Sequence, residues 1–267
     1  LILKNGARLV KEFPHIPGID FAGTVVESKS DKFKEGDEII QTGWRVGEIF
    51  YGGYSQYAKV DSNFLVKKPK EITSRQAMML GTAGLTAGLA ISTMTDKISL
   101  KGSKTVVSGA TGGVGSIGVR LLSQLGADVT AITGKMEEKL WLMELGASEV
   151  LDREEFIDST NHPLSKGKYD TALDVVGGSI LSSIIASMNY DGVITTCGNV
   201  GGPKFETTVF PFILRGNTLV GIDSAACSIE KKKMIWEIFS SIWKIDGLEK
   251  TSKLVSLENL IPEIEKI

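Results

Sequence analysis

A glycine-rich turn between an apolar strand and a helix is the feature that most constrains this chain. The segment VVSGATGGVGSIG joins a predicted strand at 105–110 to a predicted helix at 114–126, and its glycines include Gly112, Gly113 and Gly115. Such a turn lets the backbone approach a pyrophosphate, and the helix start offers free N–H groups and a positive dipole end. The hexad ATGGVG has alanine where the strict fingerprint G-x-G-x-x-G begins with glycine. We expect a dinucleotide site here; a glycine-rich turn without a ligand is the alternative.

Predicted strands and helices alternate from about residue 73 onward. The expected strands lie at 105–110, 128–133, 148–152, 169–177, 191–198 and 217–223, and the expected helices at 81–94, 114–126, 136–146, 179–188 and 231–244. A further helix is expected to begin with Thr73 or Ser74 as its cap. This alternation predicts an α/β fold with a doubly wound, parallel Rossmann sheet covered by helices on both faces. Residues 16–66 instead carry short β-forming segments broken by Gly, Asp and Pro. They indicate a small, mostly β, barrel-like unit.

The end of the second strand of the alternating region bears on the choice of cofactor. In enzymes that use NAD, an acidic residue about 20 positions beyond the glycines binds the ribose 2′-hydroxyl. Counting from the last loop glycine reaches Thr133, Gly134 and Lys135, and no carboxylate is there. Lysine neutralises a 2′-phosphate, and a hydroxyl and a backbone N–H can donate to it. With Arg153 as a second candidate cation, we predict NADPH as the cofactor; the alternative is a solvated Lys135 paired with a neighbouring glutamate.

Composition excludes several other classes of protein. The chain has 267 residues and a formal net charge of −2, so no basic field favours nucleic acid or anionic membranes. No run of 18 apolar residues and no signal peptide is visible, which predicts no membrane span. Two cysteines and two histidines are too few for a disulfide scaffold. We expect a cytoplasmic, reducing location.

Metal and nucleophilic catalysis are poorly supported by the residues present. The stretch PGIDFAG resembles the place where zinc alcohol dehydrogenases carry Gly-His-Glu, but Ile19 stands at the histidine position. A catalytic zinc needs three protein ligands, so we expect no metal. Cys197 lies in an apolar predicted strand and is expected to be a small buried hydrophobe rather than a nucleophile.

Several segments together resemble the zinc-free medium-chain dehydrogenase/reductases. They are PGIDFAG, EGDEII, GGYSQYAKV, GTAGLTA, SGATGGVG, DVVGG, MNYDGVITTCGNVGG and TTVFPFILRGNTLVGIDS. The resemblance covers nearly the whole chain and is strongest to the quinone oxidoreductase branch that includes NADPH-dependent acrylyl-CoA reductases. It implies a GroES-like β-barrel domain at 1–72, a Rossmann domain at 73–244 that binds NADPH, and a return to the GroES-like domain at 245–267.

The same resemblance implies roles for individual residues. Thr111, Gly112, Gly113 and Val114 would line the pyrophosphate beside Gly115, while Thr133, Gly134, Lys135 and Arg153 would surround the 2′-phosphate. Thr82, Asn199, Ile213 and Ser224 would approach the nicotinamide half. Ile213 could instead belong to the core, and Asn199 and Ser224 could be turn residues. Tyr54 is a candidate proton donor or pocket wall, with packing as the alternative.

Without a metal, hydrogen bonds must polarise a substrate carbonyl, which suits hydride addition to an activated C=C bond. We therefore expect NADPH-dependent reduction of an enoyl thioester such as acryloyl-CoA. The alternatives are a quinone or enone reductase without CoA preference, and a non-catalytic NADPH-binding sensor or structural protein. The resemblance also implies a homodimer paired around NTLVGID. Leu1 is not Met, and two family segments, an Asn-Tyr-Lys-Asp stretch and the closing barrel strands, are not found, so we expect both chain ends to be incomplete.

Overall fold

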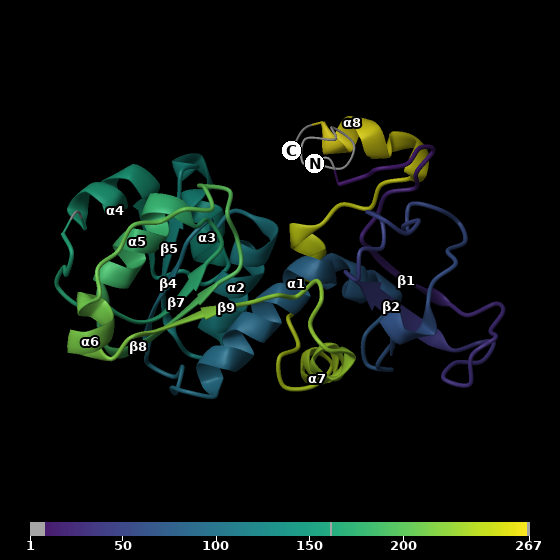
Figure 1. Cartoon of the computed structure of the whole chain (residues 1–267), viewed down its shortest axis with the longest axis horizontal. Coiled ribbons are helices and arrows are strands. Elements are labelled where there is room, and N and C mark those ends of the chain that lie inside the picture. Colours follow the sequence, from purple (N-terminus) through teal and green to yellow (C-terminus); the bar gives the residue numbers. More distant parts are fainter. Residues whose placement is uncertain (1–8, 161, 266–267) are drawn as a thin grey trace. The chain divides into compact units, whose positions relative to one another are not determined.

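The chain divides into two compact units in the computed structural model, which describes residues 9–160 and 162–265 (Figure 1). The flanking unit takes the described residues up to Leu85 together with those from Ser224 onward; the central unit is Thr86–Asp223. The division lies at 85/86 and 223/224, whereas boundaries at 72/73 and 244/245 were expected. Helix α7 (Ile229–Phe239) groups with the flanking unit because its buried Lys232 donates to Thr42 and Ala225 carbonyls of that unit.

The central unit contains one six-stranded parallel sheet. Its strands are β4 (Lys104–Val107), β5 (Asp128–Thr133), β6 (Glu149–Asp152), β7 (Tyr169–Asp174), β8 (Met188–Thr196) and β9 (Thr218–Gly221). Their spatial order is β6-β5-β4-β7-β8-β9, and every neighbouring pair is parallel. This is the doubly wound order 3-2-1-4-5-6, in which the direction of winding reverses between β4 and β7. The Rossmann prediction is confirmed.

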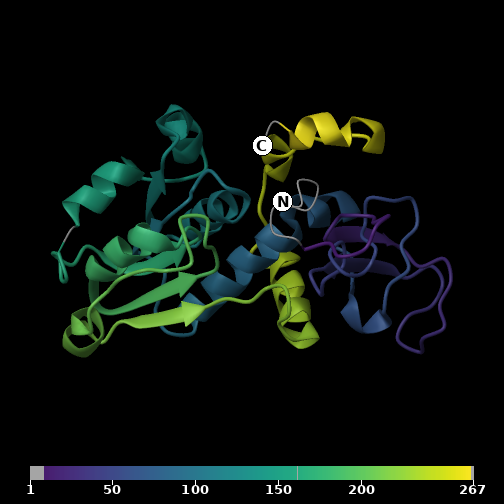
Figure 2. The same cartoon turned by 45° about the horizontal axis from the view of Figure 1, so that its top comes forward.

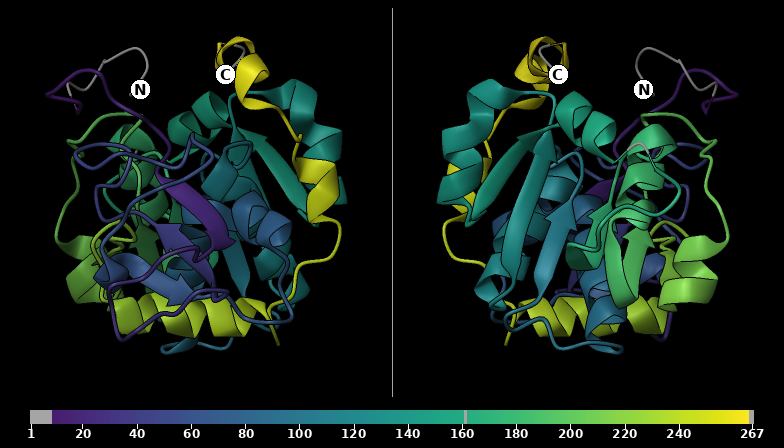
Figure 3. Two further views of the ribbon diagram at one scale, coloured as in Figure 1. Left: turned by 90° about the vertical axis from the view of Figure 1, so that its right-hand side faces the viewer. Right: turned by 90° about the vertical axis from the view of Figure 1, so that its left-hand side faces the viewer.

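Helices cover both faces of this sheet (Figure 3). They are α2 (Gly113–Gln124), α3 (Lys139–Glu144), α4 (Arg153–Ser159), α5 (Gly178–Ala186) and α6 (Phe210–Arg215), with a 3₁₀ turn η2 at Met136–Glu138. Apolar side chains of α4 and α5, including Phe156 and Ile184, form a buried cluster with Val106 and Ala172 of the sheet. The short helices α4 and α6 were not predicted. In Figure 2, β8, β9 and α6 are the green elements at one edge of the sheet.

The flanking unit contains a three-stranded antiparallel sheet in the order β1-β2-β3. The strands are β1 (Asp20–Thr24), β2 (Glu38–Thr42) and β3 (Leu65–Lys67), with a 3₁₀ turn η1 (Ser62–Phe64) before the last. Later elements are η3 (Leu248–Thr251), η4 (Leu257–Asn259) and α8 (Leu260–Ile264). Residues 51–61, predicted to be β-rich, form no strand. In the structure these residues pair with none of the described strands, and β propensity alone does not produce a strand without such pairing.

Helix α1 (Ser74–Thr95) runs through the division and is interrupted at Gly81. Gly81 has φ 51° and ψ −151°, a backbone conformation outside the helical region that glycine tolerates far better than other residues. The two predicted helices therefore form one element with a break. By length and composition alone α1 could cross a membrane, but 67% of its most apolar window is buried within the structure, as in a core helix.

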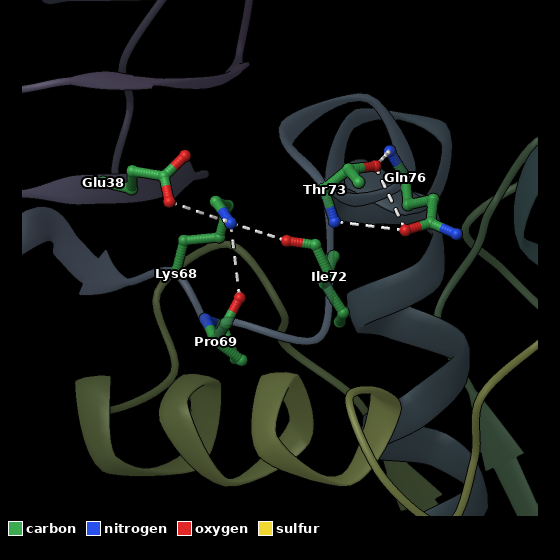
Figure 4. Close-up of polar contacts among 6 residues, drawn as sticks. All are labelled: Glu38, Lys68, Pro69, Ile72, Thr73 and Gln76. Carbon is green, nitrogen blue, oxygen red and sulfur yellow. Dashed lines mark hydrogen bonds and ion pairs between the residues drawn. The ribbon is translucent and has the colours of Figure 1, made fainter.

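A buried lysine and a capping box fix the start of α1 (Figure 4). Lys68 Nζ donates to the carbonyls of Ile72 at 2.6 Å and Pro69 at 3.3 Å, and it pairs with Glu38 Oε2 at 3.3 Å. Thr73 Oγ1 accepts from the Gln76 N–H at 3.1 Å, and Gln76 Oε1 accepts from the Thr73 N–H at 3.1 Å. This reciprocal pair satisfies N–H groups of the first turn, so the predicted cap at Thr73 is confirmed.

Candidate functional site

The loop after β4 is held close to the sheet by glycines. Gly109 has φ +57°, and a Cβ on Gly115 would lie 2.3 Å from the Gly109 carbonyl oxygen. A Cβ on Gly118 would lie 2.4 Å from Leu173 Cδ2, so α2 packs directly on β7. These contacts require glycine at both helix positions. The roles of Gly109 and Gly118 were not recognised in the sequence, although both stand in the quoted segment.

The start of α2 presents backbone N–H groups without a side-chain cap. Gly112 precedes the helix, has no side chain to cap it, and is exposed together with Gly113. The first turn carries no acidic residue. Amides of Gly113, Val114 and Gly115 lie among the first four of the helix, which lack partners within it. An anion such as a pyrophosphate suits this end of α2 electrostatically.

The end of β5 lies beside this loop. Thr133 is buried, and its Oγ1 accepts from the Lys135 backbone N–H at 3.0 Å and lies 3.4 Å from Thr111 Oγ1. Gly134 and Lys135 are exposed. Within the part of the chain that the structure describes, Lys135 forms no ion pair with Glu137 or its neighbour, so the alternative of a surface pairing is not supported.

Arg153 also reaches the end of β5. Asp152 is opposite Thr133 in the sheet, and Arg153 begins α4 directly after it. A Cβ built on Gly134 would lie 3.3 Å from Arg153 Cζ and 3.4 Å from both terminal nitrogens, so the guanidinium lies against the glycine. Arg153 Nε donates to Glu154 Oε1 at 2.9 Å on the exposed side. Thr133, Gly134, Lys135 and Arg153 are thus brought together, with two cations and an exposed glycine amide at one strand end.

Asp174 lies at the end of β7, next to the point between β4 and β7 where the direction of winding reverses. It was not singled out in the sequence. Its buried carboxylate accepts hydrogen bonds from Ser108 Oγ at 2.7 Å and Thr196 Oγ1 at 2.8 Å. It also accepts from the backbone N–H groups of Val176 and Gly177 at 3.1–3.2 Å. The loops after β4, β7 and β8 are therefore fastened to one carboxylate. The signal available was the position of DVVGG at the end of the strand next to β4.

Asn199 and Ile213 lie on segments that follow β8. Asn199 is exposed, and its Cα lies 3.3 Å from where a Cβ on Gly177 would be, so the loops after β7 and β8 pack together. Ile213 is 68% exposed on α6. The alternative of Ile213 as a core residue is therefore wrong, and its side chain is accessible.

Cys197 and Arg215 of the central unit have surroundings that indicate a structural role rather than a catalytic one. Burial, together with the nearby Asp174 charge, raises the pKa of the Cys197 thiol to about 12. At neutral pH this thiol is protonated, which argues against a nucleophile. Cys197 is half-buried and follows the last residue of β8, whereas a buried position within a strand was expected. Arg215 donates to the carbonyls of Ala186, Met188 and Ser165 at 2.5–3.1 Å.

In the flanking unit, Tyr54 contacts the segment just before β1, and Thr82 contacts the first residue of β1. The Tyr54 N–H donates to the Pro17 carbonyl at 3.0 Å, and a Cβ on Gly18 would lie 2.9 Å from the Tyr54 ring. Thr82 donates through its N–H and its hydroxyl to the two carboxylate oxygens of Asp20, at 2.8 and 2.5 Å. Both candidates, Tyr54 and Thr82, therefore contact residues of the stretch PGIDFAG (17–23).

Ser224 begins the C-terminal part of the flanking unit. The next residue, Ala225, accepts the Trp44 N–H and a hydrogen bond from Lys232 Nζ at 3.0 and 3.1 Å, respectively. The backbone beside Ser224 is therefore fixed to the loop after β2. Its expected approach to a cofactor stays a prediction.

Candidate metal ligands do not gather in the described residues. No group of three or more His, Cys, Asp or Glu side chains there could hold an ion. Ile19, at the position of a zinc-binding histidine in related enzymes, offers no donor atom. The neighbouring side chain that could offer oxygen atoms to a metal is Asp20, whose carboxylate already accepts hydrogen bonds from Thr82.

Family comparisons agree with this arrangement. Residues 113–240 match the family described as zinc-binding dehydrogenase, and residues 2–70 match the alcohol dehydrogenase GroES-like domain. With its parallel sheet and with Ile19 at the ligand position, the chain belongs to the zinc-free medium-chain dehydrogenase/reductases, a family of nicotinamide-dependent oxidoreductases.

Particular relatives place it in one branch. It is 40% identical to acrylyl-CoA reductase AcuI of Ruegeria pomeroyi, over 97% of this chain and 79% of that protein. It is 44% identical to YhfP of Bacillus subtilis, named among the quinone oxidoreductases, over 92% of this chain and 74% of that protein. The crystal structure of YhfP with NAD bound has a TM-score of 0.94 over 98% of this chain and 80% of that one. The Salmonella enterica yhdH oxidoreductase in complex with NADP is 37% identical, with a TM-score of 0.92 over 99% of this chain and 82% of that one.

Proposed function

We propose that the chain catalyses the NADPH-dependent reduction of the activated C=C bond of an enoyl thioester such as acryloyl-CoA. One observation carries the cofactor part of the proposal. Lys135 follows the end of β5, the Arg153 guanidinium lies against Gly134, and residues 133–135 include no carboxylate. Glu154 pairs with Arg153 on the exposed side. Two cations favour a 2′-phosphate, and the absence of an acid removes the usual partner of a ribose 2′-hydroxyl. NADP in the related Salmonella structure supports this choice, whereas NAD in YhfP makes it worth testing.

The residues of this chain bind and orient the cofactor in the proposed mechanism. Thr111, Gly112, Gly113 and Val114 would line the pyrophosphate beside Gly115, with the amides of Gly113 and Val114 as donors to it. Thr133 would donate to the 2′-phosphate alongside Lys135 and Arg153. Asn199, Ile213 and Ser224, with Thr82 of the flanking unit, are proposed to approach the nicotinamide half. Bound NADPH supplies the hydride that adds to the β-carbon of the substrate. In this proposal the protein binds and orients the cofactor, and the cofactor supplies the redox chemistry.

The proposed substrate must tolerate a site without a metal. Hydride addition to a C=C bond conjugated with a carbonyl moves charge to the carbonyl oxygen, which hydrogen-bond donors can stabilise. A proton then returns to the α-carbon, and Tyr54, whose side chain is 40% exposed, is the candidate donor. The identity with AcuI supports a thioester, and the identity with YhfP keeps a quinone as the second candidate.

A kinetic comparison tests the proposal. The purified chain is assayed with NADPH or NADH and one of four acceptors: acryloyl-CoA, crotonyl-CoA, a short enone and a quinone. We expect the highest kcat/KM with NADPH and acryloyl-CoA. A quinone preferred over every thioester would favour the second candidate, and tight NADPH binding without turnover of any acceptor would indicate a sensor or structural role.

We also propose that the protein works as a cytoplasmic homodimer. Strand β9 is an edge of the six-stranded sheet, and an unpaired edge needs cover. Pairing of two copies along β9 would supply it. Solution scattering tests this, because a monomeric radius of gyration at micromolar concentration would contradict the dimer.

A further inference from the structure

Asp174 connects the glycine turn before α2 to the loop after β7. Its carboxylate is fully buried, and Oδ1 accepts a hydrogen bond from Ser108 Oγ at 2.7 Å and another from the Val176 N–H at 3.2 Å. Ser108 Oγ in turn accepts the Val175 N–H at 3.0 Å. One carboxylate oxygen therefore joins the residue that follows β4 to the two residues that follow Asp174 itself.

Gly109 is held between these attachments. Its φ is +57°, and a Cβ there would lie 2.6 Å from Val175 Cγ2 and 3.0 Å from Val176 Cγ2. The Gly109 carbonyl oxygen accepts the Gly112 N–H at 2.9 Å and lies 2.3 Å from where a Cβ on Gly115 would be. The position of Gly109 therefore sets the position of the first turn of α2, whose N–H groups have no partners within the helix.

Only a group that accepts hydrogen bonds at both of its atoms suits the place of this carboxylate. Oδ1 accepts from Ser108 Oγ and Oδ2 accepts from Thr196 Oγ1, while the Gly177 N–H lies 3.2 Å from Oδ1 and 3.1 Å from Oδ2. Asparagine has the same shape, but in either orientation its NH₂ group would face one of these donors. Replacement of Asp174 by asparagine would therefore disturb the attachments without leaving a cavity.

We propose that Asp174 is a positioning residue for dinucleotide binding, which holds the glycine turn in the shape that receives the pyrophosphate. The inference rests on the proposed binding of NADPH and deepens it, because it adds a buried residue of β7 to those that determine the affinity for the cofactor. Asp174 is fully buried, so it acts through Ser108 and Gly109 rather than by contact with the ligand.

The test compares a ligand that has a pyrophosphate with one that has none. Dissociation constants for NADPH and for adenosine 2′-phosphate are measured by calorimetry for the full chain and its variants. We expect Asp174→Asn to weaken NADPH binding about tenfold, the effect of losing a hydrogen bond to a charged group, and to leave the binding of adenosine 2′-phosphate unchanged. Ser108→Ala, which removes one attachment and keeps the carboxylate, should weaken NADPH binding about threefold and again spare adenosine 2′-phosphate.

Asp170→Asn is the matched control. Asp170 lies near the other end of the same strand, where it accepts the Lys104 N–H at 2.8 Å and a hydrogen bond from Asn189 Nδ2 at 2.7 Å. This variant undergoes the same chemical change and also loses bonds from β7 to β4 and β8, but at the edge of the sheet opposite the glycine turn. It should bind both ligands as the wild type does.

Three outcomes would overturn the inference: unchanged NADPH binding in Asp174→Asn and Ser108→Ala, equal weakening of both ligands, or the same loss of NADPH binding in Asp170→Asn. If circular dichroism shows that Asp174→Asn does not fold, Ser108→Ala decides between these outcomes. If adenosine 2′-phosphate binds too weakly to measure, the comparison with Asp170→Asn decides. Wild-type protein that binds neither ligand would contradict the proposed cofactor, and the inference would fall with it. Failure to reduce acryloyl-CoA would contradict only the proposed reaction, because the binding test uses no acceptor.

Discussion

At the scale of single residues, the space left by Gly134 decides where the Arg153 guanidinium lies. Gly134→Ala would place a methyl group 3.3 Å from Arg153 Cζ, so the guanidinium would have to shift by a few tenths of an ångström from its present position. We expect the NADPH dissociation constant to rise by roughly fivefold, about 1 kcal/mol. The NADH dissociation constant serves as the internal control and should not change, since NADH has no 2′-phosphate. An equal effect on both cofactors would show that Gly134 acts through the loop instead.

Cys197 makes a second prediction at this scale. With its pKa raised to about 12, the Cys197 thiol stays protonated at the pH values where an ordinary cysteine ionises. In a Cys227→Ser background, iodoacetamide labelling of native protein should be very slow at pH 8. The rate should rise about tenfold per pH unit without a plateau between pH 8 and pH 10. Rapid labelling at pH 8, or a plateau near pH 9, would contradict the described burial.

The candidate phosphate residues could be predicted from sequence because they are local. Gly112 and Lys135 each follow a predicted strand, and the carboxyl ends of neighbouring parallel strands meet at one sheet edge. Asp174 and Asp20 could not be recognised in the same way. Their partners, such as Ser108 and Thr82, lie 66 and 62 residues away in sequence and come together only through the fold.

At the scale of elements, the start of α1 depends on Lys68 (Figure 4). Lys68→Met would remove the donor to the Ile72 and Pro69 carbonyls and leave the first of these buried without it. We expect the free energy of unfolding in urea to fall by about 2–3 kcal/mol. Lys67→Met is the matched control, because Lys67 is exposed and pairs with Asp37 on the surface; its loss should cost under about 1 kcal/mol. Equal losses in the two variants would contradict a special role for Lys68.

Elements with strong local signals were predictable, and those that depend on neighbours were not. Strand β5 has the predicted bounds 128–133. Residues 51–61 have β-forming composition but no strand, because propensity needs a paired backbone. The break at Gly81 was read as two helices, since a single glycine in a small-residue run gives no sign of its own φ and ψ.

At the scale of the whole molecule, the alternation of strands and helices was sufficient to predict the class of fold. The sheet order β6-β5-β4-β7-β8-β9 follows from right-handed crossovers once the first strand is placed in the middle. The ends of the two units were harder to predict. Lys232 joins α7 to the last residue of β2 across 190 residues, a contact that no local pattern reveals.

The cofactor preference of the wild type and of Lys135→Asp tests the central claim most directly. The ratio of kcat/KM for NADPH to that for NADH, or the corresponding ratio of association constants, should be above one in the wild type. It should fall at least about tenfold in Lys135→Asp, because an attractive charge beside the 2′-phosphate becomes a repulsive one. Lys139→Asp, the same charge change at an exposed position four residues later, should leave the ratio unchanged. A ratio that is the same in wild type and Lys135→Asp would contradict the claim that the end of β5 selects NADPH.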